Sequence, residues 1–424
     1  MRMPTLVGCA LATTVVVASV AACSSSSSSN STTPANSAAS ASAPASSASA
    51  ASPIVIGTVG SFTGPEGASQ GGVPQVINAW ADQVNAAGGI DGHQVKVIVK
   101  DIGSNPTGGL AAVQELVQSD HVVAIVGEED NGDATWASYA ESSGVPVVGG
   151  LSLDLPFVQN PDFFPAGSNT FALIYGVQTL AKGLGPNLGI LYCAESPQCA
   201  SAVALNQGTS TVSGIKIPVN VKISATAPDY TAVCQQLKSA GVQSYFVADN
   251  SAVVLRVASQ CKTDGLTAKM VGEDGEVTSA WKGQSSVNGM LLAEADAPFT
   301  DTSIPGVAQY QDAVSKYAPS LGSLQGPNSF YAYVAGKLFQ AAVAALPAGT
   351  AVSPATVKQG LYALKGATLD GLTPPLTYIQ GKPTLVNCYF TMGFDNGDFT
   401  SPNGTKTTCA PDAFVSGIVS SLPK

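Results

Sequence analysis

Apolar runs that fit β-strands alternate with amphipathic stretches that fit α-helices through most of this chain. The first series predicts strands at 54–59, 95–99, 122–126 and 145–148, with helices at 75–86 and 110–118. The second predicts strands at 188–192, 217–223, 244–247 and 270–271, with helices at 200–212, 230–239 and 252–263. Two further helices are expected at 304–317 and 329–345. Such alternation is typical of parallel sheets covered by helices. We therefore expect an α/β fold with two doubly wound parallel-sheet lobes, in which ligands bind beyond the carboxyl ends of the strands.

The first 22 residues have the features of an export signal. Arg2 is their only positive charge, and the apolar stretch at 6–20 is too short to span a bilayer. Ala21 and Ala22 before Cys23 resemble a bacterial lipobox, in which the cysteine is acylated and becomes the new N-terminus. The alternative is an ordinary secretory cleavage site with an incidental cysteine. We expect a lipoprotein signal peptide at 1–22 and a lipid on Cys23 that anchors an extracytoplasmic protein to the cell membrane.

A Ser/Ala-rich tract follows the expected lipidation site. Residues 24–52 contain no charge, no aromatic and no large aliphatic side chain, so they cannot bury enough apolar surface to offset the entropy of ordering. We expect a disordered tether at 23–52. The folded part then runs from 53 to 424, which is long enough for two lobes with cores of their own.

The formal charge of −10 argues against nucleic acid as a partner. Neutralising phosphates requires clustered Lys and Arg, and Arg256 is the only arginine after Arg2.

Six cysteines remain after Cys9 and Cys23, and an exported chain can oxidise them. Six cysteines allow 15 pairings, of which we predict the one between nearest neighbours. It joins Cys193 with Cys199, Cys234 with Cys261, and Cys388 with Cys409. A zinc site is the competing interpretation, but the chain has no CxxC and only two histidines, His93 and His121. We expect no metal and no cofactor.

Residues 85–92, NAAGGIDG, fit the pattern NxxGGIxG, in which Gly88 and Gly89 end a helix by adopting positive φ. This pattern resembles a turn of the type I periplasmic binding proteins that serve branched-chain amino acid ABC transporters. Residues 110–127 resemble the helix and strand before the first ligand loop. Further similar segments lie at 272–275, 328–345 and 371–378. Their order and spacing together carry the resemblance over nearly all of 53–424.

The resemblance implies that the chain crosses between two lobes three times, near 166–170, 293–299 and 369–374. Lobe one would comprise 53–168 plus 298–370, and lobe two 169–297 plus 371–424. Such a hinge lets the lobes close on a ligand. The implied function is an extracytoplasmic solute-binding lipoprotein, a monomer that captures an amino acid or related small polar compound and delivers it to a transporter permease with its ATPase.

In the family, lobe one holds the ligand carboxylate with hydroxyls and backbone N–H groups, and lobe two holds the ammonium with an acid. Here the first ligand loop carries acids where hydroxyls are common, which disfavours a ligand carboxylate. The expected ligand-binding residues are Phe62, Glu129, Asn131, Asp133, Ser152, Glu195, Asn250 and Asp274. Asp274 matches the ammonium-binding acid.

Three of these assignments have structural alternatives. The acids at 128–133 can instead cap a helix starting near Ala134 and face water. Asp274 can be a helix cap, and Phe62 a hydrophobic staple.

We expect no enzyme, because the chain lacks GxSxG, HExxH and a GxGxxG motif after a strand. An extracytoplasmic hydrolase that uses paired acids such as Glu128 and Glu129 is an alternative. A ligand-sensing lipoprotein that reports to a membrane partner is another, since one fold serves both uses.

Overall fold

The computed structural model describes residues 51–103, 105, 107–195 and 197–422. The expected signal peptide, Cys23 and almost all of the expected tether lie outside these residues. Strand β1 begins at Ala51, two residues before the predicted start of the folded part, because the backbone of Ala51 pairs with that of His93. The Ser52 carbonyl also lies 2.7 Å from Nδ1 of His93.

Five parallel strands form the first sheet, in the order β2-β1-β3-β4-β5. The strands are β1 (Ala51–Gly60), β2 (His93–Asp101), β3 (Ile125–Glu128), β4 (Val147–Gly150) and β5 (Phe163–Phe164). Helices α2, α3 and α11 pack on this sheet. The helices of this part of the fold are α1 (Gly67–Gln70), α2 (Val73–Ala86), α3 (Gly108–Gln118), α4 (Ala137–Ser143), α5 (Pro156–Gln159), α10 (Pro305–Tyr317), α11 (Pro327–Ala344) and α12 (Pro354–Ala363).

The second sheet has the order β14-β13-β10-β9-β8-β6-β7, with β15 paired to β13. Strands β6 to β10 are parallel, whereas β13 runs antiparallel to β10. The strands are β6 (Asn187–Cys193), β7 (Lys216–Ile223), β8 (Ser244–Ala248), β9 (Lys269–Glu273), β10 (Met290–Glu294), β13 (Cys388–Asp395), β14 (Asp398–Thr400) and β15 (Thr408–Cys409). The helices beside it are α6 (Thr170–Leu184), α7 (Pro197–Ser213), α8 (Thr231–Ser239), α9 (Ser251–Thr263) and α13 (Asp412–Ser421). A small separate ribbon pairs β11 (Lys365–Ala367) with β12 (Leu376–Thr377).

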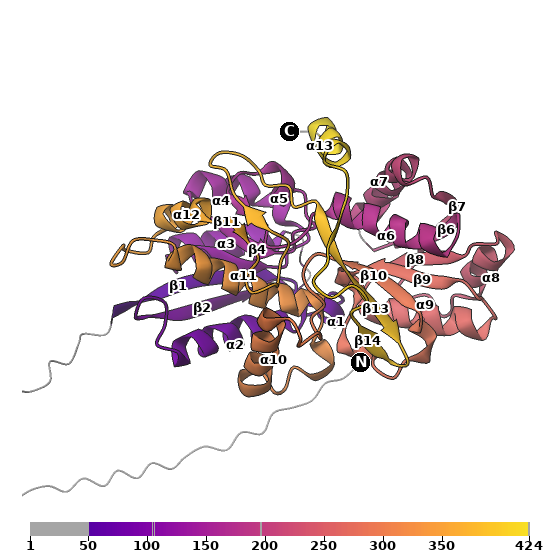
Figure 1. Ribbon diagram of the computed structural model, residues 1–424, viewed down its shortest axis with the longest axis horizontal. Coiled ribbons are helices and arrows are strands. Elements are labelled where there is room, and N and C mark those ends of the chain that lie inside the picture. Colours follow the sequence, from indigo (N-terminus) through magenta and orange to yellow (C-terminus); the bar gives the residue numbers. More distant parts are fainter. Residues whose placement is uncertain (1–50, 104, 106, 196, 423–424) are drawn as a thin grey trace, which may run out of the picture. The chain divides into compact units, whose positions relative to one another are not determined.

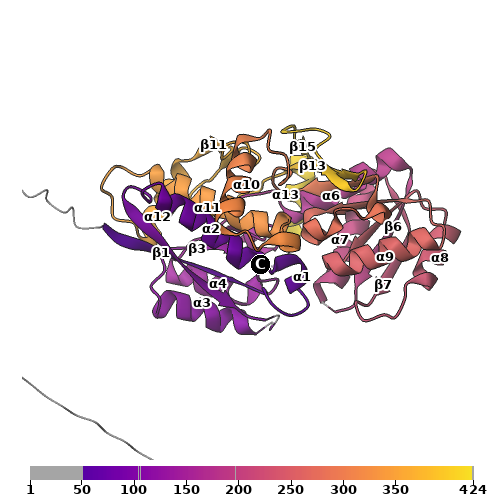
Figure 2. The same cartoon turned by 90° about the horizontal axis from the view of Figure 1, so that it is seen from below.

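The α/β fold expected from the sequence is therefore confirmed: two sheets dominated by parallel strands carry helices on their faces (Figure 1). Helix α1 contacts α11 beside the first sheet and α9 beside the second, and it lies between the two sheets in both ribbon views (Figure 2). The carboxyl ends of the parallel strands lead into the loops that approach one another here.

The predicted elements of both series are present, with shifted ends. Strand β3 begins at Ile125 and not at residue 122. The longer elements without a counterpart in the prediction include α4, α6, β10, α12 and α13. The turn at 85–92 has the expected backbone, with φ of 104° at Gly88 and 83° at Gly89.

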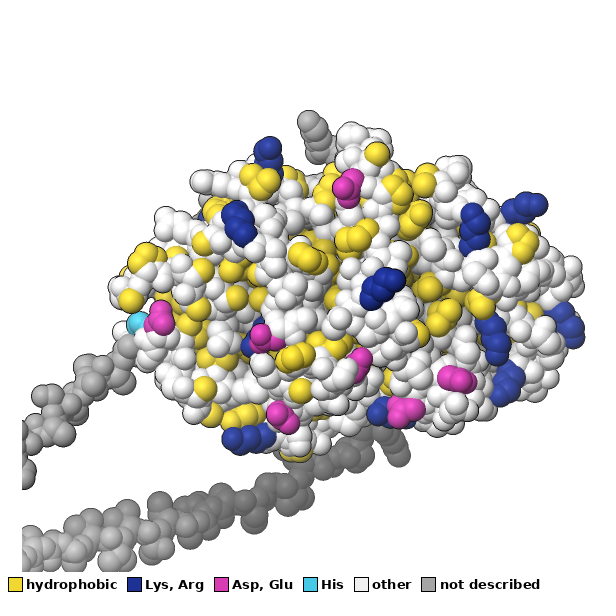
Figure 3. All heavy atoms as spheres, in the orientation of Figure 1, with side chains coloured by type: hydrophobic (Ala, Val, Ile, Leu, Met, Phe, Trp, Pro, Cys, Tyr) yellow, Lys and Arg dark blue, Asp and Glu magenta, His cyan; other side chains and the backbone are white. Residues whose placement is uncertain are grey.

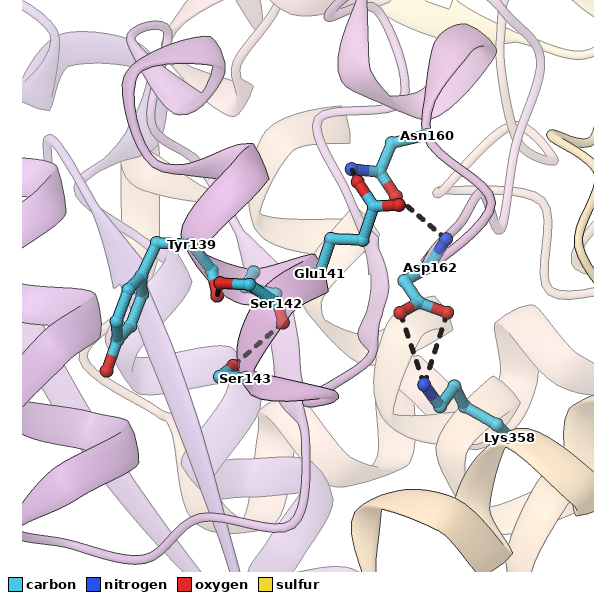
Figure 4. A network of polar contacts seen from close by, with 8 residues as sticks. Tyr139, Glu141, Ser142, Ser143, Asn160, Asp162 and Lys358 are labelled. Carbon is cyan, nitrogen blue, oxygen red and sulfur yellow. Dashed lines mark hydrogen bonds and ion pairs between the residues drawn. The ribbon is translucent and has the colours of Figure 1, made fainter.

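A polar network fastens α12 to the edge of the first sheet (Figure 4). The Lys358 ammonium lies 3.1 Å from Oδ2 of Asp162, just before β5. The Asp162 backbone N–H donates to Oδ1 of Asn160, whose amide donates to Glu141 on α4. Side chains from three separate segments thus fix this edge.

Three disulfides confirm the predicted pairing of the cysteines: Cys193 with Cys199, Cys234 with Cys261, and Cys388 with Cys409. The second joins α8 to α9, and the third joins β13 to β15. Each bond links neighbouring elements of the second sheet or its helices.

Charged side chains are spread over the face drawn in Figure 3, in several places with a basic side chain beside an acid, and no continuous basic patch is visible on that face. In the described part of the chain, no helix has the length and apolarity needed to cross a membrane.

Candidate functional site

Acidic residues follow the carboxyl ends of five parallel strands, three in the second sheet and two in the first. We call this set the acid layer. It comprises Glu128, Glu129, Asp130 and Asp133 after β3, Asp154 after β4, Asp249 after β8, Glu273, Asp274 and Glu276 at β9, and Glu294 and Asp296 at β10. Ligands of doubly wound sheets bind beyond these strand ends.

Most of these carboxyl groups are buried. Glu128, Glu129 and Asp274 are 0% exposed, and Glu294 is 2% exposed. Both carboxylate oxygens of Glu129 lack a hydrogen-bond partner within the described structure. The same holds for one oxygen in each of several others, namely Glu128, Asp133, Asp154, Asp249, Glu273, Asp274, Glu294 and Asp296. Buried polar groups without partners are rare in folded proteins and call for an explanation.

Burial raises the pKa values of these carboxyl groups, and neighbouring acids raise them further. The pKa of Glu128 lies well above its ordinary value. Burial is the largest cause, and the neighbouring acids Asp133 and Asp154 raise the pKa further. The pKa values of Asp154 and Glu273 rise to about 8, and burial is the largest cause of both increases. The pKa of Asp274 rises to about 6, again mainly through burial. Removing a carboxylate from water disfavours its charged form.

No lysine or arginine ion pair between described residues reaches the acid layer. The lysines that pair with acids are Lys100, Lys282, Lys337 and Lys358, and their partners are other acids. Arg256 lowers the pKa of Asp249 only as the last of several influences, and its guanidinium donates to the carbonyls of Ala225 and Ala227. The layer thus holds an excess of acidic groups without matching cations.

The acids at 128–133 do not face water, so that alternative is wrong. Asp130 and Asp133 are 3% and 2% exposed. Asp130 supports the loop locally, since its Oδ1 accepts from the Gly132 N–H and its Oδ2 accepts from Nε1 of Trp136 at 2.8 Å. The Glu128 carboxylate also accepts from the Asp130 N–H. The loop can fold inward because these hydrogen bonds pair its backbone N–H groups.

Asp274 connects two strand ends of the second sheet. Its Oδ2 accepts a short hydrogen bond from the Ala295 N–H just after β10. Glu273 and Glu276 form the capping box of the single 3₁₀ turn that begins at Asp274. The Asp274 carboxylate is therefore available for contacts across the layer, where the Tyr331 hydroxyl of α11 faces it.

Phe62, Glu129 and Ser152 lie around the junction of β1, β3 and β4. The Glu129 backbone bridges to Gly60, and its carbonyl accepts from the Ser61 N–H. The Phe62 ring is 5% exposed and packs against Gly60, where an added Cβ would lie 2.6 Å from the ring. Ser152 is 3% exposed, and its hydroxyl donates to the Gly150 carbonyl at 3.4 Å. These three predicted residues are brought together.

Three other predicted residues lie away from the buried centre. Asn131 is exposed, with its amide 3.5 Å from that of Gln70. Asn250 caps α9, since its Oδ1 accepts from the N–H groups of Ala252 and Val253. Glu195 is exposed, and its carboxylate accepts from the Ser224 hydroxyl and the Ala225 N–H, each at 2.8 Å.

Sequence reasoning missed two residues of α11 that reach the acid layer from the side of the first sheet. Asn328 is 4% exposed, and its amide donates to the Gly275 carbonyl at 3.4 Å while its Oδ1 has no partner. Tyr331 is 2% exposed. Asp154, Glu276, Glu294 and Asp296 were also missed. The sequence could have indicated Glu294 and Asp296, because the short apolar run at 290–293 is followed by acids, as the other strands are.

The described residues contain no group of three or more His, Cys, Asp and Glu side chains placed to hold a metal ion. Two shallow pockets of about 330 and 250 Å³ lie on the surface, the first between α7 and α13 and the second beside Tyr230 and Arg256. Neither is lined by a residue of the acid layer. The layer is closed in this structure by direct contacts between α1 and α9 and between Gln325 and Ser279.

Comparison with known proteins agrees with this architecture. The chain resembles a Pseudomonas aeruginosa protein named leucine-, isoleucine-, valine-, threonine-, and alanine-binding protein, with 26% identity over 240 residues. This match covers 53% of the chain and 61% of that relative, so it spans less than two thirds of the relative's length.

Two solved structures share the fold. One is a branched chain amino acid ABC transporter protein from Thermus thermophilus with bound valine, at 15% identity and a TM-score of 0.75, covering 86% of this chain and 98% of the other. The second is a solute binding protein from R. palustris in complex with 4-hydroxybenzoate, at 18% identity and a TM-score of 0.70, covering 85% and 98%. The family model described as periplasmic binding protein matches residues 53–398, and the chain therefore belongs to the periplasmic binding protein family, type I.

Proposed function

We propose that this protein is an extracytoplasmic solute-binding lipoprotein that captures a small polar ligand between two lobes and delivers it to an ABC transporter permease. Lobe one is taken as 53–168 plus 298–370, and lobe two as 169–297 plus 371–424. Binding proteins of this kind act by closing around the ligand. The similar proteins with bound valine and with 4-hydroxybenzoate support a small organic ligand and leave its chemistry to the site itself.

One observation carries the proposal. Strand ends of both sheets bring buried carboxyl groups together, so that Asp274 of the second sheet acts on the pKa of Glu129 of the first, after burial and Asp154. Such groups are costly to bury without a partner. A ligand that carries a positive or hydrogen-bond-donating group would supply that partner. The expected contacts are those of Glu129, Asp133, Ser152 and Asp274, with Phe62 beside them.

The membrane anchor is the second part of the proposal and rests on the lipobox-like sequence before Cys23. A lipid at Cys23 and a polar tether keep a binding protein near the permease to which it delivers its ligand. No nucleic acid, metal or cofactor belongs to this function.

A thermal-shift screen of the purified protein tests the proposal. Amino acids, amides, small acids, amines and aromatic compounds would each be added in large excess, since a ligand at 100 times its Kd stabilises the native state by about 2.7 kcal/mol. We expect one chemical class to raise the melting temperature. A screen in which no class does so would refute the assignment as a solute-binding protein.

A further inference from the structure

The acid layer draws carboxyl groups from the ends of five strands in two sheets. After burial, Asp274 helps to raise the pKa of Glu129, and Asp274 and Asp249 both help to raise the pKa of Glu276. Glu195 and Glu66, which lie nearer the surface, help to raise the pKa of Asp249. Carboxyl groups from both sheets therefore act on one another, from the half-buried Asp249 to the fully buried Glu129.

The unpaired acceptors outnumber the donors of one ammonium group. One ammonium group donates three hydrogen bonds. The buried oxygens without a partner include two from Glu129 and one each from Glu128, Asp274, Glu294 and Asp296. A single ammonium would leave several of them unsatisfied, and each would then keep its desolvation cost.

An uncharged side chain gives an independent indication of what is missing. The Asn328 amide nitrogen donates to the Gly275 carbonyl, which places the amide beside Asp274, but its Oδ1 is buried without a partner. This oxygen can only accept a hydrogen bond. The Asn328 oxygen is thus a further buried acceptor beside the carboxyl groups, and a donor-rich ligand would supply its partner.

Apolar side chains lie between the acids. Leu151 and Tyr331 beside the first sheet pack in one cluster with Ala293 and Ala295 of the second, and Leu153 lies at the edge of this cluster. A Cβ added to Gly275 would meet Leu153 at 3.8 Å. Acids with apolar side chains between them match a ligand in which charged nitrogens are separated by methylene groups.

We propose that the ligand is an aliphatic diamine or polyamine: two or more protonated amines joined by methylene segments, with no carboxylate. This inference rests on the proposed solute-binding function and names its substrate class. A ligand carboxylate is disfavoured because no ion pair of a described lysine or arginine lies in this layer, and nearby carboxyl groups would repel it when they are ionised.

A matched series of probes tests the number of cations and the absence of a carboxylate separately. Calorimetry at about 0.15 M salt, where surface attraction is screened, would compare 1,4-diaminobutane and spermidine with 1-aminobutane, which has one cation. Ornithine has the same two amines as 1,4-diaminobutane plus a carboxylate. We expect 1,4-diaminobutane or spermidine to bind at least about tenfold more tightly than both 1-aminobutane and ornithine. Equal or tighter binding of 1-aminobutane, ornithine or leucine would overturn the polyamine assignment.

Two variants show whether the amine binds in the acid layer. Glu129→Gln and Asp274→Asn keep the side-chain shape and remove the charge, and each should weaken binding of the tighter amine by about tenfold or more. Asp395→Asn, at an exposed acid at the end of β13, is the matched control and should change nothing. Equal affinity in all three variants and the wild type would mean surface binding and would overturn the proposal.

The series also separates this inference from the function on which it rests. If ornithine or leucine binds more tightly and Asp274→Asn weakens that binding, the polyamine class is wrong and the solute-binding function stands. If neither the amines nor any compound of the broad screen binds, both fail.

Discussion

Asp274 at the end of β9 and Glu129 after β3 belong to different sheets, yet the Asp274 carboxyl group helps to raise the pKa of Glu129. The pKa of Glu129 is raised by burial, then by Asp154, then by Asp274. The Tyr331 hydroxyl approaches Asp274 from α11, which packs on the first sheet. Asp274 thus lies where both sheets contribute groups to one site, and its mutation should affect binding more than folding.

Asp274→Asn should reduce affinity for the compound that the thermal-shift screen identifies by at least about tenfold, or about 1.4 kcal/mol. The amide can still accept from the Ala295 N–H, so the melting temperature of the ligand-free protein should change little. Calorimetry and a thermal melt measure the two effects. Unchanged affinity, with Asp395→Asn as the control, would mean that Asp274 only supports the local backbone.

In the closed arrangement of this structure, the protein should become more stable toward unfolding as the pH falls from 8 to 5. The raised pKa values mean that the folded state binds more protons than the unfolded state above the ordinary carboxyl range, so stability is lost as pH rises through the folded values. These are about 6 for Asp274 and Asp249 and about 8 for Asp154 and Glu273. The free energy of unfolding in urea should increase by about 2 kcal/mol or more over this interval.

The groups around these acids do not reverse that sign. Asp274 faces Tyr331, which stays protonated because burial raises its pKa, and Glu129 faces Asp154 and Asp274. Glu129→Gln removes one raised carboxyl group and should flatten the pH profile. A profile in which stability falls between pH 8 and pH 5 would show that these carboxyl groups are ionised when buried.

The sequence predicted where the acids follow strands, but it could not predict their burial. Residues 128–133 have the composition of a solvated helix cap, and only the tertiary structure shows that Trp136 and neighbouring backbone groups turn the loop inward. The family resemblance led to Asp274 and Glu129. Asn328 and Tyr331 were missed because their role depends on how α11 packs beside the second sheet.

The strand and helix pattern was predictable where apolar periodicity was regular. Helix α6 is buried on most sides, so its sequence lacks the polar face that marks an amphipathic helix. Strand β10 has only five residues, and a short apolar run gives a weak signal. Missing β10 also concealed Glu294 and Asp296. Helix α6 and strand β10 were thus missed because their burial comes from packing in the whole fold.

The six described cysteines should contain no free thiol in the native protein, which mass spectrometry after alkylation without reductant measures. Replacing both Cys234 and Cys261 with Ala should lower the free energy of unfolding by about 3 to 4 kcal/mol, because this disulfide closes a loop with a sequence separation of 27. The matched pair Cys193 and Cys199 closes a separation of 6 and should cost less, about 2 kcal/mol. Equal losses would contradict the loop-entropy argument, and full alkylation would refute the disulfides.

Cys23→Ala should release the protein from membranes. The wild type should partition into the detergent phase after Triton X-114 extraction, since its acyl chains contribute about 0.8 kcal/mol per buried CH₂. The variant should be found in the aqueous phase or retain its signal peptide. Cys9→Ala, inside the same N-terminal region, is the control and should leave partitioning unchanged. Equal partitioning of Cys23→Ala and wild type would refute the lipid anchor.

Ligand binding should bring the two sheets together, and small-angle scattering should show a smaller radius of gyration with saturating ligand. The free energy for closing comes only from contacts that the open form lacks. One contact that holds the closed arrangement is the Ser251 N–H, which donates to the Ser69 hydroxyl at 3.3 Å. Because both residues are buried, Ser69→Trp should act as a wedge that keeps the radius large and weakens ligand binding. Ser142→Trp on exposed α4 should close normally. If binding occurs without any change in radius in the wild type, the acid layer is a rigid site and the hinge mechanism is wrong.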